Sequence, residues 1–147
     1  VLVIVFFGFV PVGCTYYTMA HDWTWNVTIG CAACGLVSDL LLMLNNYRDR
    51  EQDKISGKRT IIVRFGEKAG RYAYLWLGVV AVGLCSYYAF HGLLLASLLP
   101  LLFLILHFTT WREMVRIFQG KELNIVLGKT ARNIVVFGIL LSLGLIL

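Results

Sequence analysis

The sequence predicts an all-α membrane protein with about five transmembrane helices. The chain has 147 residues, of which 59% are hydrophobic and only 14% are charged. A water-soluble domain of this size needs far more polar surface. The apolar residues also form continuous runs and do not alternate with polar ones, which favours spanning helices over a β-barrel.

Five apolar runs are predicted to cross the bilayer, because a helix needs about 20 residues to span about 30 Å of hydrocarbon. They are expected at about 1–20, 26–45, 72–90, 92–110 and 130–147. The last run is short after Asn133, so its helix either begins earlier, near Ile125, or is cut at its end. The chain opens inside an apolar run with no basic segment before it, unlike a signal peptide. We therefore interpret residues 1–147 as one partial domain of a longer protein.

The basic residues define an expected topology. All thirteen Lys and Arg residues lie in two connecting segments, 46–71 and 112–132. The positive-inside rule predicts that both segments are cytoplasmic. The net charge of +5 therefore indicates topology and contact with anionic head groups, and we expect no nucleic-acid partner.

The first of these basic segments contains a pair of aspartates, in the stretch LNNYRDREQDKISGKRTIIVRFG at 44–66. Asp49 and Asp53 are four residues apart, so on a helix their Cβ atoms would lie about 5–6 Å apart on one face. Asn45 and Asn46 come just before them, with Asn46 on nearly the same face. Two such carboxylates repel unless a cation lies between them, and Mg²⁺ takes one or two carboxylates together with phosphate oxygens.

Basic side chains follow this aspartate pair within a short loop. Arg59 could grip a phosphate with two hydrogen bonds, while Lys58 would act as a point charge. Beside an apolar bundle, this combination suits a ligand with a diphosphate head and a hydrocarbon tail. The alternative is a solvated loop held by ordinary surface ion pairs, worth about 0.2–0.5 kcal/mol each. Spacing alone leaves both interpretations open.

Asp39 lies inside the second predicted span, seven residues before Asn46 and on the same helical face. A charge near the bilayer centre costs about 2.5–3.5 kcal/mol on insertion scales. We therefore expect Asp39 to face a cavity or a polar partner. It either shapes a pocket for an aromatic ligand and positions Asn46, or it is a hydrogen-bonded structural residue.

The segment NNYRDREQDKISGKRTIIVRFG resembles the second aspartate-rich motif of the UbiA-type intramembrane aromatic prenyltransferases. The short motifs NNYRD, GKRT and VRFG within it are most similar to those of the 1,4-dihydroxy-2-naphthoate polyprenyltransferase branch. FFGFVPVGCTYY at 6–17 and KELNIVLGKTARN at 121–133 extend the likeness over the chain. The family fold is a nine-helix bundle around a cavity that opens to lipid, of which these five spans would be the C-terminal half.

The resemblance implies a reaction and a location. A polyprenyl group would pass from polyprenyl diphosphate to 1,4-dihydroxy-2-naphthoate with loss of CO₂, giving demethylmenaquinone in menaquinone biosynthesis. The enzyme would be a multi-pass protein of a bacterial inner (plasma) membrane. The alternatives are a prenyltransferase for another aromatic acceptor, or a non-enzymatic transporter fragment whose basic loops bind anionic lipid.

The resemblance also assigns roles to residues of this chain. Asp49 and Asp53 would be the catalytic, Mg²⁺-binding carboxylates. Contacts to the diphosphate would come from Arg48, Lys58 and Arg59. Polar support at the cavity floor would come from Asn45 and Asn46. The family's first aspartate-rich motif would lie before Val1, so this chain would need the missing N-terminal half and is expected to be inactive alone.

Overall fold

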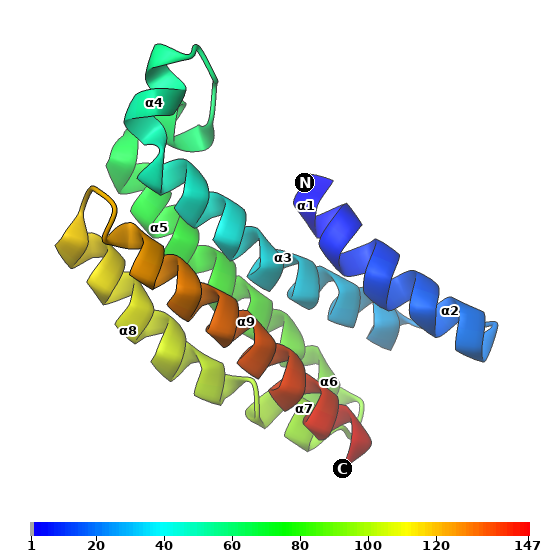
Figure 1. The fold of residues 1–147 in the computed structure, drawn as a ribbon. Helices are drawn as coiled ribbons and strands as arrows, with labels where there is room; N and C mark the ends of the chain where they lie inside the picture. The colour runs from blue at the N-terminus through cyan, green and yellow to red at the C-terminus, as the bar shows by residue number, and fades with distance from the viewer. Residues whose placement is uncertain (1) are drawn as a thin grey trace.

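The computed structural model describes residues 2–147, and every regular element within them is helical (Figure 1). Five stretches are long and apolar enough to cross a membrane: Leu2–Ala20, Trp25–Arg48, Ile61–Phe90, Leu94–Ile117 and Leu123–Ile146. The prediction of an all-α membrane protein with five spans is therefore confirmed. That residues 1–147 form one partial domain stays a prediction.

The first span consists of three consecutive helical segments, α1 (Leu2–Ile4), the π-helix η1 (Val5–Cys14) and α2 (Thr15–Ala20). Pro11 lies inside η1. Proline has no N–H to donate and its ring clashes with the preceding turn, and the wider π-helical turns accommodate both defects. The span ends where His21 adopts a left-handed conformation, with φ of 52°.

The second span is α3 (Trp25–Arg48), and it begins at a capped end because the Thr24 side chain accepts a hydrogen bond from the Val27 N–H. The short helix α4 (Arg50–Ile55) follows directly. The remaining elements are α5 (Ile61–Cys85), α6 (Tyr87–Phe90), α7 (Leu94–Leu98), α8 (Leu101–Ile117) and α9 (Leu123–Ile146).

Two predicted boundaries need correction. The third membrane-length stretch begins at Ile61, where Thr60 caps the helix by accepting from the Val63 N–H at 3.2 Å, but Gly66 is non-helical (φ 85°, ψ 170°) and kinks it. The helix that continues to Cys85 therefore starts just after Gly66, a few residues before the predicted start near 72. Its charged first turns are amphipathic, and hydropathy alone assigns them to a loop. The last span begins at Leu123, in agreement with the earlier of the two starts considered and not with 130.

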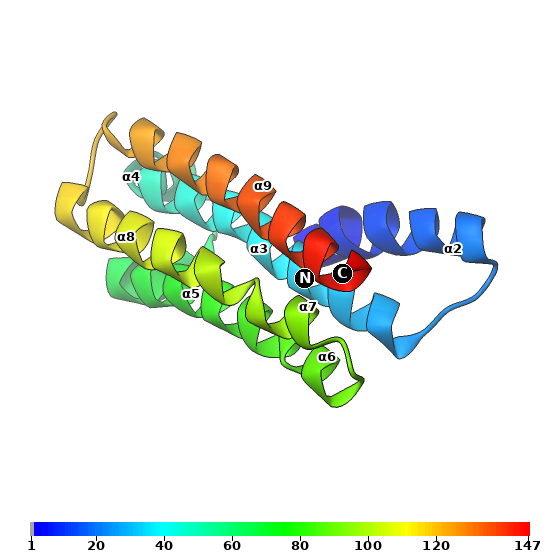
Figure 2. The same cartoon turned by 90° about the horizontal axis from the view of Figure 1, so that it is seen from below.

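Four long helices, α3, α5, α8 and α9, form the bundle, while the first span packs chiefly along α3 (Figures 1 and 2). The aromatic core of the bundle includes Tyr47, Tyr74, Phe103 and Phe137. Glycines allow the first span to approach α3 closely: a Cβ on Gly35 would lie 2.8 Å from the Ile4 Cα. Small residues serve this purpose at helix contacts in membranes.

His107 belongs to a set of polar groups inside the bundle. Its ring stacks between Tyr74 and Phe103, with centroid separations of 5.0 and 5.2 Å. Its Nε2 lies 3.1 Å from the Leu75 carbonyl oxygen, and Tyr74 shares a 2.8 Å hydrogen bond with Thr130. Gly78 leaves the room that this imidazole fills.

We therefore expect Gly78→Ala to destabilise the protein by about 1–3 kcal/mol, since the added methyl would overpack a ring already held on both faces. Thermal unfolding of the complete protein in detergent measures this. Gly83→Ala is the matched control on the same helix, because a Cβ there meets nothing within 4 Å. Equal melting temperatures for the two variants would contradict the packing assigned to His107.

Candidate functional site

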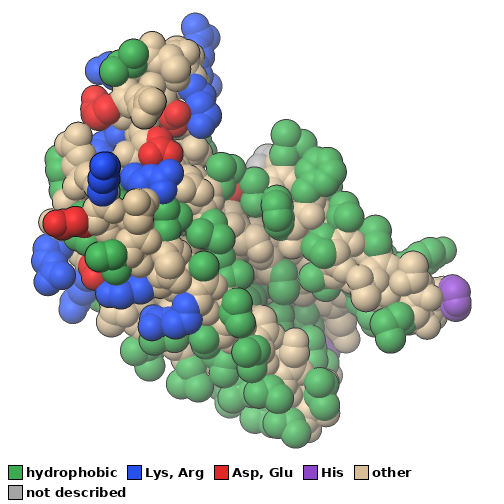
Figure 3. Space-filling view, in the orientation of Figure 1, with side chains coloured by type: hydrophobic (Ala, Val, Ile, Leu, Met, Phe, Trp, Pro, Cys, Tyr) green, Lys and Arg blue, Asp and Glu red, His purple; other side chains and the backbone are tan. Residues whose placement is uncertain are grey.

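The charged side chains gather at one end of the bundle, over α4 and the connection between α8 and α9 (Figure 3). Basic residues of 46–71 and 112–132 therefore lie together in space. The rest of that view is mostly apolar, as expected where helices face lipid. The candidate site is at this charged end.

Asp49 and Asp53 stay one helical turn apart although the helix changes direction between them. Asp49 ends α3 with φ of −92° and ψ of 8°, and α4 starts at the next residue. The Asp53 N–H still donates to the Asp49 carbonyl oxygen at 2.8 Å. The spacing that the sequence suggested is thus present in the backbone.

Asp49 is paired with its neighbour in the chain. Arg48 donates from Nε to Oδ1 and from Nη2 to Oδ2 of Asp49, each at 2.7 Å. This guanidinium holds the pKa of the Asp49 carboxyl below its usual range. The remaining Arg48 nitrogen, Nη1, donates to Asn124 Oδ1 at 2.8 Å. Arg48 therefore joins the aspartate segment to the start of α9.

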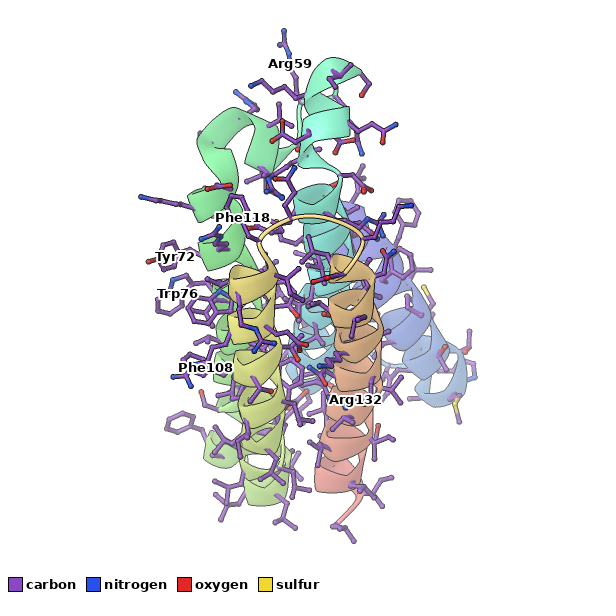
Figure 4. The ribbon with its side chains drawn as sticks, turned by 60° about the vertical axis from the view of Figure 1, so that its left-hand side comes forward. Arg59, Tyr72, Trp76, Phe108, Phe118 and Arg132 are labelled. Atoms are coloured by element: carbon purple, nitrogen blue, oxygen red, sulfur yellow. The ribbon has the colours of Figure 1, made fainter. Side chains whose placement is uncertain are left out.

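Asp53 is buried and is paired with Lys58, whose Nζ lies 3.3 and 3.4 Å from the two carboxylate oxygens. The Lys58 N–H also donates to the Asp53 carbonyl oxygen at 2.9 Å, which closes the loop after α4. Arg59 differs, since its side chain extends from the tip of this loop away from the bundle (Figure 4). Of the two basic residues predicted after the aspartates, the structure brings only Lys58 to them.

The other candidate residues lie along α3. Asn45 and Asn46 are half-buried in its last turn. Asp39 lines a cavity of about 320 Å³ between α3 and α5, together with apolar side chains such as Met43 and Trp76. Ten residues of helix separate Asp39 from Asp49, about 15 Å along the axis. Asp39 thus lies at an open groove that is separate from the aspartate pair, and its role stays a prediction.

A cluster that the sequence did not indicate supports the aspartate segment; we name it the arginine–aromatic cluster, and its members are Tyr47, Arg50, Glu67, Arg71 and Phe118. Arg50 is only 6% exposed, and its Nη1 donates to the Tyr47 carbonyl oxygen at 2.8 Å. Its guanidinium lies over the rings of Tyr47 and Phe118, at 4.6 and 5.0 Å.

The cluster connects α3, α4, α5 and the loop after α8 at the charged end. Arg71 of α5 donates to the Tyr47 hydroxyl at 2.9 Å and lies 4.9 Å from the Phe118 ring centroid. Glu67 is within 3.7 Å of Arg50 and 3.8 Å of Arg71. Cations over desolvated aromatic faces are stabilised by about 2 kcal/mol. The cluster therefore anchors the loop after α8 (Figure 4) to the turn that carries Asp49 and Asp53.

The aspartate pair, Asp49 and Asp53, is the candidate metal-binding group at this end. Within residues 2–147 there is no group of three or more His, Cys, Asp or Glu side chains placed to hold a metal ion. Two carboxylates one turn apart nevertheless suit Mg²⁺, which commonly uses one or two of them with substrate phosphates and water. The donor set fits a metal bound jointly with a phosphate ligand.

Five membrane-length helices with an aspartate pair and basic side chains at one end define a multi-pass membrane protein with one strongly charged end. The family model described as the UbiA prenyltransferase family matches residues 1–123. The chain belongs to this family, which confirms the resemblance seen in the aspartate-rich segment.

Curated relatives give a more specific likeness. The chain is 34% identical to a 1,4-dihydroxy-2-naphthoate octaprenyltransferase of Haemophilus influenzae, over 99% of this chain and 47% of the relative. It is 38% identical to the Escherichia coli protein of the same name, over 62% and 30% of the two chains. A 2-carboxy-1,4-naphthoquinone phytyltransferase of Synechocystis is 30% identical, over 64% and 33%. The chain spans about half the length or less of these relatives, and no solved structure matches it.

The pairing of Arg48 with Asp49 predicts a pH dependence. Because the pKa of Asp49 is lower when folded than the unfolded value of about 3.9, the ion pair stabilises the fold above that pH. Its contribution is lost as the pH falls through the folded-state pKa. Arg48→Gln should raise this pKa toward the ordinary value, measurable by carboxyl ¹³C NMR titration in detergent.

The control for this titration is Arg64→Gln, which removes a cation of the same kind from an exposed position on α5. It should leave the Asp49 midpoint unchanged. An identical midpoint in wild type and Arg48→Gln would show that the guanidinium does not set the ionisation of Asp49.

Proposed function

We propose that this chain forms the C-terminal half of a membrane enzyme that prenylates 1,4-dihydroxy-2-naphthoate. The polyprenyl group comes from polyprenyl diphosphate, and the immediate product is the hydroquinone form of demethylmenaquinone, for menaquinone biosynthesis. The observation that carries the proposal is the aspartate pair, held one turn apart beside Arg48 and Lys58. Family membership and the names of the relatives support the reaction class.

The residues of the pair would hold Mg²⁺ through their carboxylates, in concert with carboxylates from the rest of the protein. When bound, the metal ion neutralises the diphosphate and stabilises it as a leaving group. Arg48 and Lys58 reinforce this role, because both carry donors at the same place and can turn from the aspartates to phosphate oxygens. The Lys58 side chain is 58% exposed, so no packed neighbour blocks such a turn.

The proposed chemistry balances over three steps: ionisation, attack and decarboxylation. The allylic C–O bond breaks and the diphosphate leaves with the electron pair, so that an allylic cation develops. A ring carbon of the naphthoate then attacks the cation and a new C–C bond forms. The same ring carbon bears the carboxylate, whose C–C bond breaks to release CO₂ and return its electrons to the ring. Aromaticity is thereby restored.

The reaction would take place at the cytoplasmic face of a bacterial plasma membrane. The positive-inside rule supports this side, because both basic segments lie at the end that carries the aspartates. The polyprenyl tail would then lie among the spans while the diphosphate stays at the charged end. Arg59, which points away from the bundle (Figure 4), contacts the diphosphate in this proposal only if its loop moves inward.

We expect Asp49→Asn and Asp53→Asn to lower prenyl transfer by two or more orders of magnitude, because each removes a metal-binding charge. The assay uses membranes containing the complete protein, polyprenyl diphosphate and labelled 1,4-dihydroxy-2-naphthoate. Glu51→Gln is the matched control, since Glu51 lies between the two aspartates on α4 with its side chain 65% exposed. Near-normal turnover in both aspartate variants would contradict the metal-binding role proposed for Asp49 and Asp53.

Substrate and metal requirements can be measured in the same membranes. Chelation should abolish transfer and Mg²⁺ should restore it, because the diphosphate is a poor leaving group without a cation. CO₂ release should match product formation one for one. Equal or faster transfer to 4-hydroxybenzoate would instead assign the chain to an enzyme for another aromatic acceptor.

A further inference from the structure

A second polar feature lies between α8 and α9, apart from the aspartate pair. It is a cleft of about 350 Å³ lined by Thr109, Arg112, Glu113, Arg116 and Lys129. None of these residues takes part in the proposed prenyl transfer. The cleft contains three cationic side chains and one carboxylate, so it has an excess of positive charge.

Only one of the three cationic side chains in this cleft is paired with a carboxylate. Lys129 of α9 places Nζ 2.6 and 2.8 Å from the Glu113 carboxylate oxygens of α8, which neutralises that pair. Arg112 and Arg116 are one turn apart on α8, and like charges at this spacing repel each other. Among the residues that the structure describes, neither guanidinium forms an ion pair. These two side chains are therefore the free cations of the cleft.

Arg112 is held at the rim of the cleft by an aromatic ring. Its guanidinium lies 4.7 Å from the centroid of the Phe108 ring, one turn earlier on α8. Such a contact holds the guanidinium in place. Its N–H donors remain available to other acceptors, because an aromatic ring is not a hydrogen-bond partner for all of them. The cleft thus presents a pre-positioned donor for an anion.

The position of the cleft in the spans restricts what can occupy it. Arg112 and Arg116 lie in the membrane-length stretch Leu94–Ile117, and Lys129 lies in Leu123–Ile146. Charged residues inside spans face a cavity, a polar partner or the interface. Arg132 follows Lys129 by one turn on α9 (Figure 4), and its Nη2 donates to Asn133 Oδ1 at 3.1 Å.

Exposed apolar side chains lie on the same two helices, farther from the charged end than the cleft. Ile105 and Phe108 of α8 are 64% and 42% exposed, and Val135 and Ile139 of α9 are exposed as well. A ligand with a charged head and hydrocarbon chains would contact both regions at once. A small free anion would use only the charged one.

We propose that this cleft binds the phosphate head group of an anionic phospholipid from the leaflet at the charged end. The guanidinium groups of Arg112 and Arg116 donate to the phosphate oxygens, and the acyl chains lie along α8 and α9. Arginine suits this role because its planar donors match phosphate geometry. Basic pockets between spans are a general mode of head-group recognition. The binding does not depend on the proposed reaction.

Native mass spectrometry of the complete protein in detergent tests this directly. The protein is mixed with equal amounts of phosphatidylglycerol and phosphatidylcholine of matched acyl chains. We expect wild type to retain phosphatidylglycerol about tenfold better. The double variant Arg112→Gln/Arg116→Gln should lose this preference. Each single variant should lose part of it, which keeps the test decisive where the double variant unfolds.

Arg64→Gln/Lys68→Gln is the matched control. These two residues are also basic, exposed and four positions apart, and Arg64 likewise lies over a ring, 5.6 Å from the Phe65 centroid. Neither lines the cleft. The control variant should keep the wild-type lipid preference. An equal loss in both variants would overturn the proposal in favour of general surface charge.

Competition separates the sources of phosphate. Inorganic phosphate at millimolar concentration should not displace the bound phosphatidylglycerol, and displacement would assign the cleft to a free anion. Polyprenyl diphosphate should compete no better than phosphatidylglycerol. A clear preference of the cleft for the diphosphate would make it a substrate site and likewise overturn the proposal. Unchanged lipid selectivity in the arginine variants would also overturn the proposal.

Discussion

The cost of placing charge in hydrocarbon is the constraint on which the rest of this structure depends. A central charge costs about 2.5–3.5 kcal/mol on insertion scales, which is a large fraction of a domain's net stability. The thirteen basic residues are therefore confined to two segments that meet at one end. Any anionic ligand must be recognised there, so both the aspartate pair and the basic cleft lie at or near that end.

The same constraint explains how polar groups inside the bundle are arranged. Tyr74 and Thr130 satisfy each other, and the Asn133 amide donates to the Thr110 hydroxyl at 2.9 Å. At the charged end, Arg50 is tolerated at 6% exposure because aromatic faces, Glu67 and a backbone carbonyl surround it. Burial of a cation without these partners would be far more costly.

Features set by neighbouring residues, such as spans and helical spacing, could be predicted from the sequence. Contacts between residues far apart in the chain could not. Continuous apolar runs were enough to find five spans, and the spacing of Asp49 and Asp53 was enough to place them one turn apart. The third span was placed too late in the sequence because charged residues such as Glu67 lower the hydropathy of the helix that continues after the kink at Gly66. The arginine–aromatic cluster could not be predicted, because Arg50 and Phe118 meet only through tertiary packing.

The partners of the two aspartates bear on how the proposed enzyme would bind its ligands. Arg48 and Lys58 now serve as counter-ions, so the pair of carboxylates is neutralised within its own segment. In the proposed enzyme, the carboxylates of Asp49 and Asp53 would hold a metal ion, and Arg48 and Lys58 would then be free to contact the diphosphate. The two ligands would then bind in a coupled way, because each satisfies the charges that the other leaves unpaired. The arginine–aromatic cluster would support this exchange by fixing the backbone of the segment while the side chains change partners.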